Sequence, residues 1–143
     1  MNGIYLCFDF GGRRIGIAAG QAVTRSANPV TTVAATAGEP DWAEIDRIVR
    51  DWQPAALVVG IPVHMDGTEQ PGTRRARTFA QRLGARYGVP VHEADERLSS
   101  REAEALIAAG RQSGHRRRTR KGDVDRMAAT LILERWLADH AGD

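Results

Sequence analysis

The chain has 143 residues, 42% of them hydrophobic and 27% charged, a composition that favours one soluble globular domain spanning residues 1–143. It contains no apolar run long enough to cross a membrane, no signal peptide at its start and only one cysteine, which excludes a membrane protein and a disulfide-rich secreted one. We therefore expect a cytoplasmic protein. The formal net charge is only +2, so the positions of the charges are more informative than their sum.

The first informative stretch is a short apolar run at residues 4–8, of the kind that forms a strand buried on both faces. Asp9 follows, and a pair of glycines then permits a tight turn into an antiparallel strand at 15–19. A charge beside a buried strand is costly unless it is paired or holds a metal ion. Two interpretations stay open: Asp9 accepts hydrogen bonds from the turn with Arg13 or Arg14 as ion partner, or it belongs to an active site.

Three further strands and four helices are expected along the rest of the chain. Residues 29–33 are rich in β-branched side chains and predict a third strand that closes an antiparallel meander, followed by a loop at 34–40. Apolar runs predict strands at 55–60 and at 89–93, where Pro90 indicates a sheet edge. Apolar residues at helical spacing predict helices at 41–52, 73–87, 99–109 and 123–140. This order predicts an α/β layered domain with a mixed sheet.

Two more acidic points follow Asp9 along the chain. Asp125 lies one turn before Ala128, on the apolar stripe of the last predicted helix, where packing alone does not explain an acid. The alternative is that Asp125 only complements the helix dipole. Asp95 and Glu96 follow a predicted strand, at the end of an open α/β sheet where ligands bind.

These carboxylates can face one crevice, because they come from the ends of two strands and the start of a helix. Three acids without a basic partner repel one another unless divalent cations lie between them. Oxygen ligands suit Mg²⁺ or Mn²⁺, and paired ions of this kind are the usual means of cleaving phosphodiesters. The pattern therefore indicates a metal-dependent site for phosphodiester hydrolysis.

Four separated motifs, FDFGGRRIGIA, VVGIPVHMDGTEQ, DERLSS and VDRMAATLIL, closely resemble in order and spacing the YqgF/RuvX family. That family belongs to the RNase H-like nucleases and is related to the RuvC-type Holliday junction resolvases. The resemblance covers residues 4 to about 137. It implies an RNase H-like α/β fold with a mixed five-stranded sheet, in which three antiparallel strands precede alternating strands and helices, and with helices on both faces.

Carried over position by position, the resemblance implies that Asp9, Glu96 and Asp125 are the catalytic residues and bind two Mg²⁺ or Mn²⁺ ions. Asp95 directly precedes Glu96 and is expected to be a supporting or alternate metal ligand. In the resolvases an acid near the end of the fourth strand contributes to catalysis. Residues 59–62 of this chain offer none there, so that role would pass to Glu96.

Basic residues crowd the segment between the third and fourth predicted helices. A local basic cluster in a chain of nearly balanced charge suits contact with the phosphates of nucleic acid, whereas composition alone slightly favours a solvated loop. Such contacts would orient the nucleic acid without reading its sequence. The residues assigned to nucleic-acid binding are Arg13, Arg97, Arg116, Arg117, Arg118, Arg120 and Lys121.

The loop at residues 63–73 resembles the most distinctive segment of the family, NMDGTEQ, with His64 where Asn is more usual. Its polar residues suit a flap over a phosphate backbone. The alternative is a structural loop in which Asp66 and Gly67 form a turn and Thr68 caps locally. We do not expect His64 to bind a metal ion.

The leading hypothesis is therefore a metal-dependent endonuclease acting on structured nucleic acid. The resemblance implies two substrates, the precursor of 16S ribosomal RNA, which we favour, and four-way DNA junctions in recombination and repair. Symmetric cleavage of a junction needs two active sites and hence a homodimer, for which Trp42, Trp52 and Trp136 are candidate surface residues if exposed. A third hypothesis is a non-catalytic nucleic-acid-binding maturation factor on a nuclease fold.

Overall fold

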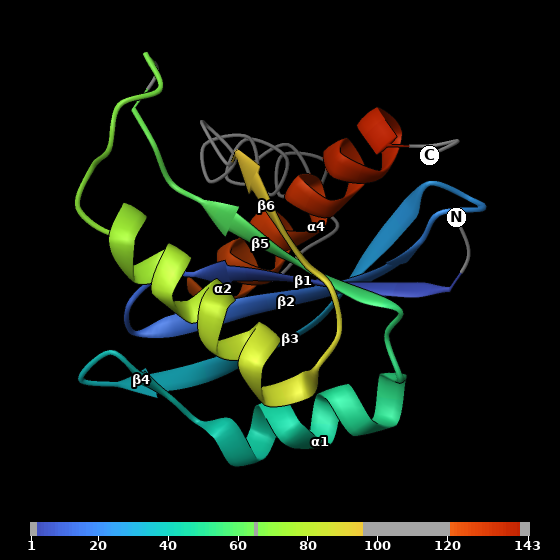
Figure 1. The fold of residues 1–143 in the computed structure, drawn as a ribbon, viewed down its shortest axis with the longest axis horizontal. Helices are drawn as coiled ribbons and strands as arrows, with labels where there is room; N and C mark the ends of the chain where they lie inside the picture. The colour runs from blue at the N-terminus through green and yellow to red at the C-terminus, as the bar shows by residue number, and fades with distance from the viewer. Residues whose placement is uncertain (1–2, 65, 96–120, 141–143) are drawn as a thin grey trace, which may run out of the picture.

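The apolar run at the start of the chain forms β1 (Ile4–Phe10), which lies inside a six-stranded mixed sheet in the computed structural model (Figure 1). The structure describes residues 3–64, 66–95 and 121–140. The strand order is β4-β3-β2-β1-β5-β6. β1 pairs antiparallel with β2 (Arg14–Gln21) and parallel with β5 (Ala56–Ile61), so both of its edges are hydrogen-bonded. The prediction of a buried strand followed by an antiparallel return is confirmed.

The antiparallel meander is longer than predicted and carries an additional strand. β3 (Ser26–Thr36) extends past the predicted residues 29–33, and β4 (Glu39–Pro40) pairs with its end. The expected loop at 34–40 is therefore wrong, and so is the count of five strands. Ala37 and Gly38 both have positive φ, 52° and 82°, the geometry of a two-residue hairpin turn. A two-residue strand is too short to show an alternating apolar pattern, which explains the missed element.

The other elements agree closely with the predicted ranges. They are α1 (Trp42–Trp52), α2 (Thr73–Tyr87), β6 (Val91–Asp95) and α4 (Lys121–His140). The carboxylate of Asp41 accepts the amide N–H of Glu44 at 3.3 Å and so caps α1. β6 is the edge strand, as Pro90 indicated. The predicted helix at 99–109 lies outside the described residues, and none of the described helices is long and apolar enough to span a membrane.

Helices cover both faces of the sheet, with α1 and α2 on one face and α4 on the other (Figure 1). Side chains alternate along β1, so Leu6 and Phe8 enter the core under α1 and α2, whereas Tyr5 and Cys7 enter the core under α4. Cys7 is fully buried in apolar surroundings, as expected. Asp9 shares the parity of Tyr5 and Cys7 and therefore lies on the α4 face.

α4 lies so close to β2 that the two backbones touch at Gly16. A Cβ added at Gly16 would lie 2.1 Å from the carbonyl oxygen of Asp125 and 2.3 Å from its carbonyl carbon. Further along the same strand, a Cβ at Gly20 would lie 3.0 Å from a side-chain carbon of Leu133. The two glycines thus let the helix rest directly on the sheet, and this approach places Asp125 over β2.

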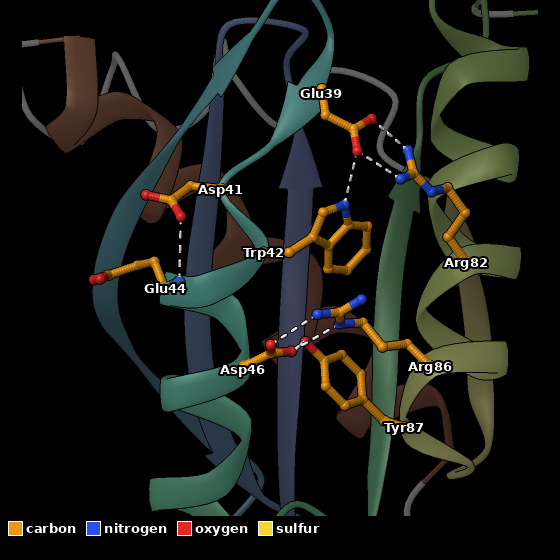
Figure 2. A network of polar contacts seen from close by, with 8 residues as sticks. All are labelled: Glu39, Asp41, Trp42, Glu44, Asp46, Arg82, Arg86 and Tyr87. Carbon is orange, nitrogen blue, oxygen red and sulfur yellow. Dashed lines mark hydrogen bonds and ion pairs between the residues drawn. The ribbon is translucent and has the colours of Figure 1, made fainter.

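α2 is tied to the β3–β4 hairpin and to α1 by paired charges. Figure 2 shows the first of these contacts, in which the Arg82 guanidinium donates two hydrogen bonds to Glu39, at 2.8 and 2.7 Å. The indole N–H of Trp42 on α1 donates to the same carboxylate at 3.2 Å. The Arg82 guanidinium also lies over the Trp42 ring, 5.0 Å from the ring centre. One carboxylate therefore joins three elements.

A second cluster ties the C-terminal end of α2 to α1. Arg86 donates two hydrogen bonds to Asp46, at 2.7 and 2.8 Å, and the Tyr87 hydroxyl donates a third at 2.6 Å (Figure 2). These donors, Arg86 foremost, lower the pKa of Asp46 to about 2. The C-terminal half of α2 is thereby held against α1, and its first turn projects toward the end of β1.

Candidate active site

Asp9 lies near the C-terminal end of β1, between two glycines of the neighbouring strands. Its direct partners across the sheet are Gly16 on β2 and Gly60 on β5. Neither neighbour has a side chain, so no side chain beside Asp9 in the sheet crowds its carboxylate. Asp9 is only 9% exposed, and a charge this buried is costly unless it is paired, hydrogen-bonded or bound to a metal ion.

Asp125 reaches the same region from the first described turns of α4. Its carboxylate accepts a hydrogen bond from Nε of Arg14 at 2.6 Å, an ion pair between residues 111 positions apart. The Asp125 side chain is 20% exposed and that of Arg14 is 38% exposed. The expectation that the acids lack a basic partner is therefore wrong for Asp125. Arg14, one of the two arginines considered as a partner for Asp9, is ion-paired with Asp125, because Arg14 and Gly16 share one face of β2 beneath α4.

A hollow of about 260 Å³ brings the two carboxylates together at the C-terminal ends of β1 and β5. Its wall combines the β1–β2 turn, the loop after β5, the first turn of α2 and the start of α4. The lining residues are Asp9, Phe10, Gly11, Gly12, Pro62, Gln70, Pro71, Gly72, Arg75 and Asp125. The predicted convergence of Asp9 and Asp125 at one end of the sheet is thus observed.

The β1–β2 turn forms one rim of this hollow. The amide N–H of Gly11 donates to the carbonyl of Arg14 at 2.9 Å, and Gly12 has a φ of 89°, which residues with a side chain rarely adopt. A Cβ at Gly12 would lie 3.5 Å from Nη1 of Arg75, so this guanidinium stands against the turn. Arg75 was not among the predicted site residues. The missed signal is an arginine in the first turn of a helix that follows a parallel strand.

The loop after β5 is built around the predicted turn. The carboxylate of Asp66 accepts the amide N–H of Thr68 at 3.0 Å and its hydroxyl at 2.6 Å, and Gly67 has a φ of 88°. These hydrogen bonds lower the pKa of Asp66. His64 takes part through its backbone, donating to the carbonyl of Thr68 at 2.9 Å. At the base of the loop the buried hydroxyl of Thr73 accepts the Gln70 amide at 2.9 Å, which holds the loop against α2.

Asp95 lies on the other face of the sheet from Asp9. It pairs with Ile61, which belongs to the core under α1 and α2, whereas its neighbour Ala94 pairs with Gly60 on the α4 face. Asp95 is not among the residues that line the hollow, and its expected role as a supporting or alternate ligand stays a prediction.

The remaining predicted residues divide into two groups. Arg13 is exposed at the β1–β2 turn, and Lys121 begins α4. The others lie outside the described residues, namely Glu96, Arg97, Arg116, Arg117, Arg118 and Arg120.

The donor chemistry of the hollow suits a hard divalent cation. Asp9 and Asp125 present carboxylate oxygens, the ligands that Mg²⁺ and Mn²⁺ prefer. Among residues 3–64, 66–95 and 121–140 no cluster of three or more Asp, Glu, His or Cys could hold a metal ion. Asp9 and Asp125 line one hollow, and Glu96, the third predicted acid, lies outside the described residues.

The order of strands, the helices on both faces and the acid on the central strand define an RNase H-like fold. The structure superposes on Thermus thermophilus RuvC in complex with a Holliday junction substrate with a TM-score of 0.55, at 15% identity over 97% of this chain and 96% of that one. It superposes on the yeast mitochondrial Holliday junction resolvase with a TM-score of 0.52, at 9% identity over 93% and 77% of the two chains. At these identities the likeness concerns the fold alone.

The chain belongs to the RuvX family, whose sequence model, described as "Holliday junction resolvase", matches residues 3–139. The family resemblance inferred from four motifs is thereby confirmed. A protein of Cronobacter sakazakii is 48% identical over 140 residues, covering 98% of this chain and 99% of its own. One of Azotobacter vinelandii is 46% identical over 137 residues, covering 95% and 94%. Both relatives carry the name "Putative pre-16S rRNA nuclease".

Proposed function

We propose that this protein is a divalent-metal-dependent endonuclease that hydrolyses phosphodiesters in the precursor of 16S ribosomal RNA. The observation that carries the proposal is the meeting of Asp9 and Asp125 in one hollow at the end of the central strand, with glycines on both sides of Asp9. The RNase H-like fold and the RuvX family support a nuclease. The name of the full-length relatives supports the choice of RNA.

Asp9 and Asp125 would hold the metal ion, with Glu96 as the third carboxylate. Asp95 is not assigned a ligand role here, because it is not among the residues that line the hollow. When bound, a divalent cation lowers the pKa of a coordinated water and offsets the negative charge that develops on the phosphate.

The protein's own residues would prepare this site before substrate arrives. Arg14 fixes the direction of the Asp125 side chain through its 2.6 Å hydrogen bond. Gly16 lets the α4 backbone bring that carboxylate onto the sheet, and the glycine turn leaves room for a phosphate beside Asp9. Burial of Asp9 strengthens its attraction for a cation, because little water screens it.

The alternative is resolution of four-way DNA junctions, which the family description and the RuvC complex favour. That activity would need a dimer with two active sites. Of the three tryptophans considered for a dimer surface, Trp136 is buried, and Arg82 and Arg86 lie over the ring of Trp42. Trp52 is exposed and is the remaining candidate.

A cleavage competition tests the proposal. The protein, with Mn²⁺, is mixed with a labelled 16S precursor RNA and a labelled four-way DNA junction in one tube. We expect selective cutting of the RNA, loss of cutting in Asp9→Asn, and full activity in Asp51→Asn, a matched change at an exposed position on α1. Paired symmetric nicks in the junction would establish the resolvase instead. Cleavage of neither substrate would leave the non-catalytic factor, and full activity of Asp9→Asn would remove Asp9 from the site.

A further inference from the structure

A second hollow adjoins the candidate active site across the first turns of α2. It measures about 180 Å³ and lies between α2 and the β3–β4 hairpin, which stand at the same end of the sheet as the β1–β2 turn (Figure 1). Its lining residues are Phe10, Gly38, Pro40, Arg74, Arg75, Thr78, Phe79 and Arg82. Phe10 and Arg75 also line the hollow that holds Asp9. The two hollows are therefore neighbours that share a wall, and Arg75 stands at their junction.

The lining of the second hollow is basic. It contains three arginines and no acid. Arg82 is already neutralised, because it donates two hydrogen bonds to Glu39. The Arg74 side chain is 90% exposed, and its Nε lies 3.8 Å from the carboxylate of Glu69. This lining suits an anion more than it suits an apolar ligand or a cation.

Arg75 differs from the other arginines further along α2. Arg77 pairs with Glu69 at 3.0 Å, and Arg82 and Arg86 each form two hydrogen bonds to one carboxylate. Within the described part of the chain, no ion pair or hydrogen bond is formed by the Arg75 side chain. The Arg75 guanidinium stands against a glycine turn and lines the same hollow as Asp9 and Asp125, but it has no ion-pair partner among the described residues. Such a guanidinium is suited to bind an external phosphate through two parallel hydrogen bonds.

We propose that Arg75 is a substrate-positioning residue, and that a nucleic-acid strand runs from the hollow of Asp9 over the first turn of α2 into the second hollow. Arg75 binds the phosphate next to the cleaved one, and Arg74 contacts the backbone further along. This path rests on the proposed nuclease function and deepens it. The contacts are to phosphates, so they hold the strand in register without selecting its sequence.

Binding and cleavage are measured separately to test this path. Anisotropy of a fluorescein-labelled RNA strand and of the matching DNA strand is followed over a salt series with EDTA present, in an Asp9→Asn background that prevents cleavage. We expect Arg75→Gln to weaken binding about tenfold, as for one charge-assisted hydrogen-bonded contact. The slope of log Kd against log salt should fall by about 0.7, as for one phosphate of a single strand.

Two further variants distinguish a contact from a structural effect. Arg75→Lys should restore the salt slope, because the charge remains, while leaving affinity below that of the parent. Arg77→Gln is the matched control on the same helix, and it should leave both quantities unchanged because Glu69 already binds that guanidinium. The Tm of each variant should equal that of the parent protein.

The outcomes separate this inference from the proposed activity. An unchanged salt slope in Arg75→Gln overturns the path, even if the parent protein cleaves RNA. A reduced slope supports the path even if no substrate is cleaved, in which case only the nuclease proposal fails. Absence of any binding by the parent, or equal effects of Arg75→Gln and Arg77→Gln, also overturns it.

Discussion

Replacing Gly16 by alanine should move the Asp125 carboxylate by filling the contact between β2 and α4. The added Cβ would lie 2.1, 2.3 and 2.8 Å from three backbone atoms, the oxygen and carbon of the Asp125 carbonyl and the nitrogen of Arg126. No change of rotamer relieves a clash with backbone. Ordinary contact begins at 3.4 Å, so the closest of these atoms must retreat from 2.1 Å by about 1.3 Å. The helix turn that carries Asp125 therefore has to leave the sheet.

This displacement should lower both the stability of the protein and its rate of cleavage. Overpacking of a close contact costs about 1–3 kcal/mol of unfolding free energy. In a domain of this size each kcal/mol lowers Tm by about 2–4 °C, so Tm should fall by about 2–12 °C. Misplacement of a catalytic group by about 1 Å can reduce activity about 100-fold. We therefore expect Gly16→Ala to remain folded at 25 °C and to cleave about 100-fold more slowly.

Two other glycines provide controls for the assay, which compares Tm by circular dichroism with Mn²⁺-dependent cleavage at 25 °C. Gly20→Ala should lower Tm through contacts with Ser26 at 2.6 Å and Leu133 at 3.0 Å, without touching the turn of Asp125. Gly84→Ala, inside α2 and 3.5 Å from Val91, should stabilise the helix by about 0.5–1 kcal/mol. Wild-type Tm and activity in Gly16→Ala would refute the close α4–β2 contact. If Gly20→Ala lost as much activity as Gly16→Ala, the loss in Gly16→Ala would be explained by reduced stability alone.

Two further predictions concern ion pairs. The Arg14→Gln variant should bind Mn²⁺ several-fold more tightly, because the metal ion no longer competes with a guanidinium 2.6 Å from the Asp125 carboxylate. Titration calorimetry measures this affinity, and weaker binding would contradict the competition. The pKa of Asp46 falls from 3.8 to about 2 on folding, so its stabilisation is present above pH 3.8 and is lost between pH 3.8 and 2. Asp46→Asn should thus lower Tm much more at pH 6 than at pH 2. A difference of equal size at the two pH values would show that the charge is not responsible.

Local patterns in the sequence determined the elements that carry the site. The apolar run before Asp9, the glycine pair after it and the spacing of apolar residues in 73–87 are properties of neighbouring residues, and they predicted β1, its turn and α2 closely. The cap at Asp41 likewise marked the start of α1. Such signals are strong because strand alternation and helical periodicity are set by the backbone of the segment itself.

The contacts of the site, in contrast, were decided only by the tertiary structure. The pairing of Arg14 with Asp125 joins residues 111 positions apart, and it depends on where α4 crosses β2. The face on which Asp95 lies depends on the register of β6 against β5, since a shift of one residue reverses every side chain. Arg75 lines the hollow of Asp9 only because α2 packs with its first turn beside Gly12. Register and helix crossing arise from packing between distant segments, which no local pattern contains.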